Sequence, residues 1–224
     1  MFLLAPHPKP ERPLRGSPRM FRVDWIEKYF SRVRPWHIVV LWVPFALWCL
    51  WQAVTTVHEH PVTLTLLIGV GVLGWTLSEY LLHRFLFHFK ADEKSKWQPD
   101  AAYLIHGIHH DYPWDGDRLV MPPFAGAVIC VFLWMLVHLV LGDHTYAFFT
   151  GMVSGYLWYD LTHYYVHHAK PRTPLGKWLR KYHMLHHFSG THARYGITTP
   201  LWDHVFRTYP QEQERPAEDV EAHA

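Results

Sequence analysis

Residues 62–82 read VTLTLLIGVGVLGWTLSEYLL, and residues 83–88 continue as HRFLFH. The first stretch contains one acid, Glu79, and no lysine or arginine. Its length matches the run of about 20 apolar residues that a helix needs to cross a bilayer. The two stretches together predict a transmembrane helix that ends in a pair of histidines, His83 and His88.

Three further apolar stretches of similar length occupy residues 36–57, 124–141 and 146–165. The links at 58–61 (HEHP) and 142–145 (GDHT) are very short, so the four stretches predict two tight helical hairpins. Small residues within the stretches suit close contact between helices in lipid. These are Gly69, Gly71, Gly74, Gly151 and Gly155.

The basic residues decide between a membrane protein and a soluble protein with unusually apolar helices. All 21 lysines and arginines lie before residue 36, between residues 82 and 124, or after residue 165. Neither short link contains one. Because cytoplasmic segments of membrane proteins are enriched in lysine and arginine, this distribution places both termini and residues 83–123 in the cytoplasm.

The predicted fold is therefore an all-α integral membrane protein, with four transmembrane helices and a cytoplasmic helical cap. We divide the chain into a basic N-terminal arm (1–35), a membrane domain (36–210) and a C-terminal tail (211–224). The net charge of +2 argues against a nucleic-acid partner. Cys49 and Cys130 lie inside apolar stretches, so any metal would need nitrogen or oxygen ligands.

Histidine is the unusual residue of this chain, with 20 copies. Ten of them form a pair, a triplet, a second pair and a second triplet, and both triplets read His-x-x-His-His. The pairs stand at the ends of the second and fourth apolar stretches. The ten are His83, His88, His106, His109, His110, His163, His167, His183, His186 and His187.

The spacing of these histidines indicates two metal ions. Residues three and four apart share one face of a helix, so the first histidine of each triplet faces the other two. The last two histidines of a triplet point about 100° apart and can serve neighbouring ions. Imidazole binds zinc, iron, copper and nickel well, and ten ligands divide naturally between two ions. A single histidine is more often a surface residue or part of the core than a metal ligand. Four groups of histidines on the same side of a membrane are better explained by metal binding.

Acidic side chains near these motifs are candidates to orient the histidine rings or to offset the charge of the ions. His168, next to the second pair, is a possible additional ligand. The acidic candidates are Glu79, Asp111, Asp160 and Asp203.

Several longer strings resemble one known family. HRFLFH (83–88), HGIHHDYPWDGDRLVMPP (106–123), GYLWYDLTHYYVHH (155–168), HMLHHF (183–188) and GITTPLWDHVF (196–206) resemble the membrane fatty acid 2-hydroxylases of the fatty acid hydroxylase (sterol desaturase) superfamily. The resemblance covers about residues 36–208. The His-x-x-His-His boxes also occur in sterol desaturases, alkane hydroxylases and acyl desaturases, whereas the longer strings are more particular to the 2-hydroxylases.

The resemblance implies an enzyme with two iron ions held by the ten histidines, although zinc can occupy such a cage in a purified protein. It implies hydroxylation of an acyl chain of a membrane lipid, next to the carbonyl carbon, with O₂ and two electrons. About 35 residues precede the first predicted span, which leaves no room for the cytochrome b5 domain of many relatives. Electrons are therefore expected from a separate cytochrome b5-, ferredoxin- or rubredoxin-like protein.

Aromatic residues and one arginine near the histidines are candidates to contact the substrate. The aromatic residues could equally form the usual belt at a membrane interface. The six candidates are Tyr112, Trp114, Arg118, Tyr164, Tyr165 and Trp202.

Two alternatives to fatty acid hydroxylation remain at this stage. One is a related chemistry, namely sterol or carotenoid oxidation, desaturation or ether-lipid cleavage. The other is metal transport or sensing, which predicts ligands along a path through several spans. The histidines gather on one side of the membrane, which disfavours transport. The exact lipid, the electron donor and the oligomeric state do not follow from the sequence.

Overall fold

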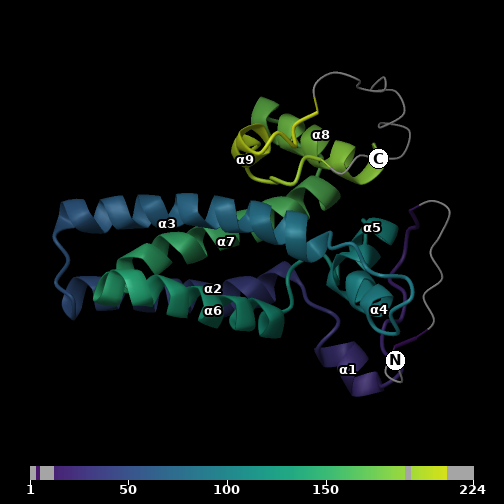
Figure 1. The fold of residues 1–224 in the computed structure, drawn as a ribbon, viewed down its shortest axis with the longest axis horizontal. Helices are drawn as coiled ribbons and strands as arrows, with labels where there is room; N and C mark the ends of the chain where they lie inside the picture. Colours follow the sequence, from purple (N-terminus) through teal and green to yellow (C-terminus); the bar gives the residue numbers. More distant parts are fainter. Residues whose placement is uncertain (1–3, 6–12, 190–192, 211–224) are drawn as a thin grey trace.

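The computed structural model describes residues 4, 5, 13–189 and 193–210, and this part of the chain is helical throughout, without a strand. A single isolated bridge pairs Leu4 with Phe21. The predictions for residues 1–3 and 6–12 of the arm, and for the tail at 211–224, lie outside these described residues. Figure 1 shows a long bundle of helices with shorter helices gathered at one end.

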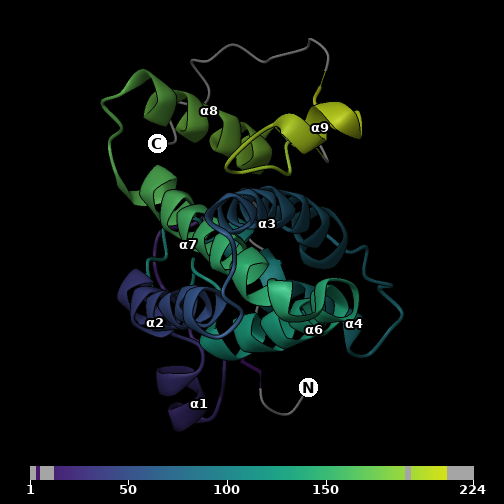
Figure 2. The same ribbon diagram turned by 90° about the vertical axis from the view of Figure 1, so that its left-hand side faces the viewer.

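Four long helices form the bundle: α2 (Pro35–Thr55), α3 (Pro61–Leu81), α6 (Pro123–Leu141) and α7 (Thr145–His168). Each corresponds to one of the predicted apolar stretches. Helix α7 packs against the other three and is the most buried of the four (Figure 2). Where the chain turns between α6 and α7, Gly142 adopts a φ of +54°, which favours glycine, in the short helix η3 (Gly142–His144).

Glycines bring α3 and α7 into close contact. A Cβ atom on Gly71 would lie 2.0 Å from the carbonyl oxygen of Phe148, and one on Gly151 would lie 1.9 Å from that of Ile68. A Cβ atom on Gly155 would lie 2.8 Å from the Cβ atom of Trp75, whereas Gly69 has no neighbour within 4 Å. The predicted close contact between helices is therefore a backbone contact at Gly71 and Gly151 and a side-chain contact at Gly155, and it is absent at Gly69.

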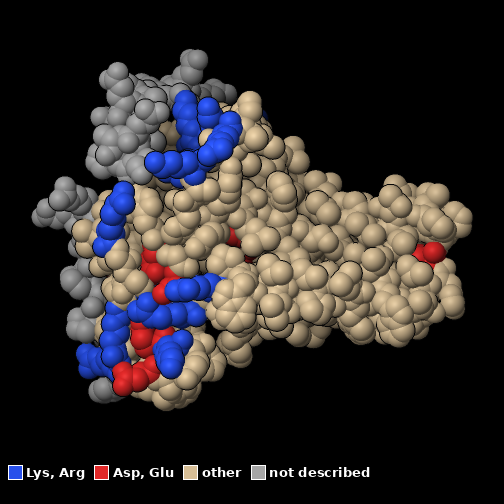
Figure 3. All heavy atoms as spheres, turned by 180° about the vertical axis from the view of Figure 1, so that it is seen from behind, with Lys and Arg blue, Asp and Glu red and all other residues tan. Residues whose placement is uncertain are grey.

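Three continuous helical stretches are long and apolar enough to cross a membrane: Pro35–Thr55, Pro61–Phe87 and Pro123–His168. The last of these contains both α6 and α7. Lysine and arginine side chains gather at one end of the molecule, while the surface of the long bundle on the face seen in Figure 3 carries none. Membrane-capable helices and this separation of charge are what the sequence predicts.

The charged end holds the elements that carry the histidines. Helix α3 continues into a π-helix, η1 (Leu82–Phe87), and a second π-helix, η2 (Tyr103–Gly107), connects α4 (Gln98–Ala102) to α5 (Ile108–Asp111). Helices α8 (Pro174–Phe188) and α9 (Leu201–Val205) lie at the same end (Figure 1). These elements surround the ends of α3 and α7, where the histidine pairs stand.

The N-terminal segment also packs at this end. It forms the short helix α1 (Asp24–Tyr29), and Met20, Glu27 and Val33 are buried. The backbone amide of Leu14 donates to the carbonyl of Asp111, 2.8 Å away. The described part of the arm is thus attached to the body of the protein.

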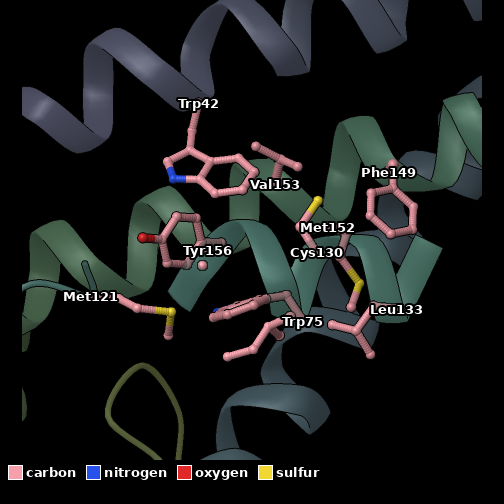
Figure 4. A pocket seen from close by; sticks show the side chains of 11 residues that line it. Trp42, Trp75, Met121, Cys130, Leu133, Phe149, Met152, Val153 and Tyr156 are labelled. Atoms are coloured by element: carbon pink, nitrogen blue, oxygen red, sulfur yellow. The ribbon is translucent and has the colours of Figure 1, made fainter. Parts of the chain in front are cut away.

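The core of the bundle is aromatic. The rings of Trp75 and Tyr156 are 5.0 Å apart, those of Trp42 and Tyr156 are 5.4 Å apart, and those of Trp134 and Phe149 are 4.7 Å apart. A small apolar cavity of about 30 Å³ remains among Trp42, Trp75, Phe149 and Tyr156 (Figure 4). Such packing holds α2, α6 and α7 together and leaves α7 fixed at the centre.

Candidate metal centre

Two π-helical turns place the first histidine pair and triplet. In η1 the amide of His88 donates to the carbonyl of His83, five residues earlier, at 3.1 Å. This wider turn brings side chains five apart onto one face, which explains the spacing of His83 and His88. In η2 the amide of Ile108 reaches back to the carbonyl of Tyr103 in the same way. Single π-turns inside helices are frequently found at functional sites.

The second pair and triplet lie on regular helices. His163 and His167 are one turn apart near the end of α7, and His183, His186 and His187 lie in the last part of α8. Helix α8 begins with Thr173, whose hydroxyl accepts from the amide of Gly176. The two halves thus present similar histidine sets from different kinds of helix.

The ten histidines assemble into two groups of five. Within each group the candidate ligand nitrogens all lie within 4.8 Å of one another. We define the first histidine group as His83, His88, His106, His110 and His186, and the second as His109, His163, His167, His183 and His187.

Each half of the sequence contributes four histidines to its own group and one to the other group. His109 comes from the first half but joins the second group, and His186 comes from the second half but joins the first group. Each is the middle histidine of its triplet. Neighbouring residues His109 and His110 therefore belong to different groups, as do His186 and His187. The rings of His110 and His187, one from each group, are 4.3 Å apart.

The imidazoles face one another through their Nε2 atoms. These atoms are 3.2 Å apart in His83 and His106, and 3.0 Å apart in His88 and His186. In the second group, His183 Nε2 lies 2.8 Å from His167 Nε2 and 3.0 Å from His187 Nε2.

The outer nitrogens of two histidines contact backbone carbonyls. His83 Nδ1 lies 2.6 Å from the carbonyl oxygen of Tyr195, and His186 Nδ1 lies 2.8 Å from that of Ala193. Because a carbonyl only accepts, each Nδ1 carries the proton, and each Nε2 keeps a lone pair directed into the group. The segment 193–195 thereby sets the tautomer of two rings that come from different helices.

Five of the histidines that lie outside the membrane-capable helices are held neutral. Burial, followed by the neighbouring imidazoles, lowers the pKa of His106, His109 and His110 well below its ordinary value. The same causes lower the pKa of His183 and His187. Neutral imidazole is the form that binds metals, so both groups are prepared for ligation at neutral pH.

Two of the predicted acids support the histidines through the backbone. Asp203 accepts from the amides of Tyr195 (2.9 Å) and Gly196 (2.8 Å). Glu79 accepts from the amides of Ile197 (2.5 Å) and Thr198 (2.9 Å). Both acids therefore fix the segment whose carbonyls hold His83 and His186, and they act on those rings through the backbone. Arg194, between the two carbonyls, has a φ of +61°, an uncommon conformation for a residue with a side chain.

The remaining candidates near the histidines have other surroundings. Asp160 is buried and accepts from the amide of Met121 (3.2 Å) and the hydroxyl of Tyr156 (2.9 Å). Asp111 ends α5 and accepts from Leu14 through its backbone carbonyl. His168 is exposed, stacks on Tyr164 with ring centroids 4.4 Å apart, and belongs to neither group.

An apolar cavity of about 620 Å³ lies beside the two groups. His106, His109 and His163 line it, together with Tyr159 and Asp160 of α7. Its volume falls in the range of about 300–1,000 Å³ that is typical of small-molecule sites. Exposed apolar side chains stand among its lining residues, and these are Phe30, Leu86, Ile105 and Phe124.

Of the six predicted substrate residues, only Arg118 lines this cavity. Trp114 stacks on Phe188, with ring centroids 6.0 Å apart, and the indole of Trp202 donates to Thr76 at 3.0 Å. Tyr165 is exposed, and Tyr112 directly follows α5. Tyr159 was missed, although its position four residues before His163 places both on one helix face.

Comparison with known proteins identifies the family. The fatty acid hydroxylase family model matches residues 68–208. A dihydroceramide fatty acyl 2-hydroxylase of Arabidopsis thaliana is 45% identical, over 87% of this chain and 81% of that protein. The chain belongs to the fatty acid hydroxylase family. This confirms the resemblance that the histidine strings indicated.

Other proteins that resemble this fatty acid hydroxylase family member support the same assignment. Fatty acid 2-hydroxylase of Rattus norvegicus is 35% identical, over 92% of this chain and 60% of that protein. A solved structure, described as full-length Scs7p with only the hydroxylase domain visible, is 36% identical. It superposes with a TM-score of 0.78 and covers 84% of this chain and 70% of that one.

The donor atoms of this family member fit first-row transition metals. Each group offers only imidazole nitrogens, which suit iron, zinc, copper and nickel rather than magnesium or calcium. His110 Nε2 is buried and has no hydrogen-bond partner. Buried polar atoms without a partner are costly, and a bound cation would satisfy this lone pair together with its neighbours.

Proposed function

We propose that this protein is a membrane di-iron hydroxylase that introduces a hydroxyl group at C2 of the acyl chain of a membrane lipid. The observation that carries the proposal is the placement of two five-histidine groups beside one apolar cavity. The relatives named above are 2-hydroxylases of fatty acids or of dihydroceramide fatty acyl chains, which supports the same position of attack.

The ten histidines are the proposed ligands, five to each ion. Iron held there supplies, with O₂ and two electrons, the oxidising power that an unactivated C–H bond requires. The chain's own residues do the remaining work. The carbonyls of Ala193 and Tyr195 orient the rings of His186 and His83. The apolar wall of the cavity holds the acyl chain against His106, His109 and His163 and keeps water away from it.

The substrate is proposed to come from the bilayer. Phe30, Leu86, Ile105 and Phe124 are exposed and also line the cavity, so an acyl chain can pass from lipid into it without crossing water. Asp160 lines the same cavity, and we propose it as a candidate contact for the polar part of the substrate.

We further propose four membrane crossings, with the termini and the histidine groups on the cytoplasmic side. The long stretch Pro123–His168 divides at η3 into two helices, each long enough to cross. The lysines and arginines at the histidine-bearing end support this orientation. The same basic surface suits an acidic electron-donor protein of the cytochrome b5, ferredoxin or rubredoxin kind.

Metal analysis and lipid analysis of the same preparation test the function. The purified chain is expected to contain two equivalents of metal, and the iron-loaded form is expected to produce 2-hydroxy acyl lipids with a supplied reductant. A zinc-loaded sample serves as the control and is expected to be inactive, because zinc is not redox-active. Oxidised sterols, carotenoids or unsaturated chains in place of 2-hydroxy products would contradict the proposed reaction.

A further inference from the structure

One wall of the large cavity comes from the chain before the first long helix. Met20, Phe21, Phe30 and Ser31 all line it, together with residues beside the histidine groups. Met20 is buried, with 7% of its surface exposed, and Phe21 is half-buried. A segment that the sequence indicates to be a basic arm is therefore part of the cavity.

Glu27 holds this segment in place. Its Oε2 accepts from the backbone amides of Met20 (3.0 Å) and Phe21 (3.1 Å), so one carboxylate oxygen fixes the two wall residues directly. Its Oε1 accepts from Arg32 at 3.0 Å and forms an ion pair with Arg118. Glu27 is the link between the wall and the loop that leads into α6.

Arg118 is the other half of this link. Its side chain is only 3% exposed, and its Nη1 donates to Asp115 at 2.8 Å. Its Nε donates to the hydroxyl of Ser31, another wall residue, at 2.9 Å. The guanidinium is thus occupied by Glu27, Asp115 and Ser31. This makes Arg118 a positioning residue for the wall rather than a contact for a lipid head group.

We propose that residues 20–31 form the wall that selects the acyl chain, and that the Glu27–Arg118 ion pair sets the position of this wall. The inference rests on the proposed hydroxylase function, because it takes the cavity to be the acyl site. Met20 and Phe21 fill volume that a longer or bulkier chain would need. Discrimination by such a wall is measurable, since one methylene in an apolar pocket changes specificity by about 10–200-fold.

Photocrosslinking of the unmodified full-length chain tests the location of the wall. A fatty acid with a diazirine on its acyl chain is bound in membranes and illuminated, and the labelled peptides are mapped by mass spectrometry. We expect adducts within residues 20–31 that decrease when an excess of unlabelled fatty acid competes. Labelling confined to other elements would overturn the proposal, and this readout does not require turnover.

Product analysis with mixed chain lengths tests selection. Met20→Ala and Phe21→Ala are expected to shift the ratio of long to short 2-hydroxy products at least several-fold toward longer chains. Glu27→Gln is expected to broaden the distribution. The matched control is Trp36→Ala, an aromatic residue of α2 that is 59% exposed, lies outside residues 20–31 and does not line the cavity, and it should leave the ratio unchanged.

The ratio separates selection from general damage. A variant that only unfolds would lose all products equally and keep their ratio. If the wild-type chain makes 2-hydroxy products and the wall variants keep its ratio, the wall is not selective. If the wild-type chain makes none, the proposed function fails, while crosslinking still decides whether residues 20–31 meet an acyl chain.

Discussion

At the scale of single residues, the middle histidine of each triplet distinguishes this centre from two independent sites. His109 and His186 each lie in the group whose other members come mainly from the opposite half of the sequence. Loss of either ring therefore weakens one group and also removes a link between the halves. Their position makes them the most informative pair to change.

Replacement of His109 or His186 by alanine should abolish hydroxylation and lower the metal content below that of the wild type. The reason is that each change removes one of five candidate nitrogens and leaves a gap among buried imidazoles. Metal analysis and product analysis of the purified variants check this. His204→Ala, at an exposed residue of α9, is the control and should behave as the wild type. Full activity of either variant would contradict the ligand assignment.

Asp203 is the residue whose effect should act through the backbone. Its two oxygens accept from Tyr195, Gly196, Tyr182 and Thr208, all as donors. In Asp203→Asn the side-chain NH₂ group, itself a donor, would replace one of the accepting oxygens. The segment that orients His83 and His186 would therefore move. We expect a loss of about 10–100-fold in metal affinity, as is typical for groups that orient metal ligands. Competition for the metal with a chelator measures this affinity. An unchanged affinity would show that segment 193–196 does not orient the metal ligands.

At the scale of elements, close helix contact and the packed N-terminal segment decide the geometry of the centre. Helix α3 leads into η1 and its histidine pair, and α7 carries the second pair, so the α3–α7 contact at Gly71 and Gly151 sets the distance between the pairs. Met20, Phe21, Phe30 and Ser31 of the N-terminal segment then line one side of the cavity. Both features depend on contacts between elements that are distant in sequence.

The α3–α7 contact is tested by Gly151→Ala. The new Cβ would lie 1.9 Å from the backbone oxygen of Ile68, which cannot move without its helix. Overpacking of this kind costs about 1–3 kcal/mol, so a lower thermal midpoint in detergent is expected. Gly69→Ala on α3, where nothing lies within 4 Å, is the matched control and should retain the wild-type midpoint. Equal midpoints for both variants would argue against the close contact.

The attachment of the N-terminal wall should depend on pH. Burial raises the pKa of Glu27. The amides of Phe21 and Met20 and the guanidiniums of Arg118 and Arg32 together lower it by more than burial raises it, so the pKa in the folded protein lies below the ordinary 4.5. A lowered pKa means that the stabilisation is present above pH 4.5 and is lost as the pH falls through the folded pKa. Asp117, paired with Arg34 and Arg32, has a lowered pKa and acts in the same direction.

Hydrogen exchange of residues 20–31 as a function of pH measures this attachment. Protection is expected to decrease as the pH falls below 4.5, while the long helices stay protected. In Glu27→Gln the segment should exchange faster already at neutral pH, and the decrease should be smaller. Protection that is independent of pH in the wild type would contradict the role of the ion pair.

At the scale of the whole molecule, the separation of charge predicts how the chain lies in the membrane. Four crossings place Thr56 and Asp143 on one side and Ser95 on the other. Thr56 and Asp143 are exposed and Ser95 is half-buried, and single cysteines at these three positions can be labelled with an impermeant thiol reagent in vesicles of known orientation. Native Cys49 and Cys130 lie within α2 and α6 and are first replaced by alanine. Labelling of Asp143→Cys from the same side as Ser95→Cys would contradict two crossings within Pro123–His168.

Local pattern was sufficient for much of this protein. Runs of about 20 apolar residues predicted the four long helices, because a helix must satisfy its own backbone hydrogen bonds in lipid. Histidine spacing selected the ten residues that assemble, because residues three and four apart share a helix face. The longer strings indicated the family that the comparisons confirm.

Tertiary structure alone decided how these parts combine. The exchange of His109 and His186 between the groups depends on how α5 and α8 meet, and no spacing within either helix contains that information. Glu79 and Asp203 act on a segment more than a hundred residues from His83, through backbone atoms that are the same for every sequence. Residues 20–31 are held beside the cavity by the ion pair between Glu27 and Arg118. These two residues are distant in sequence, so only the folded chain brings them together.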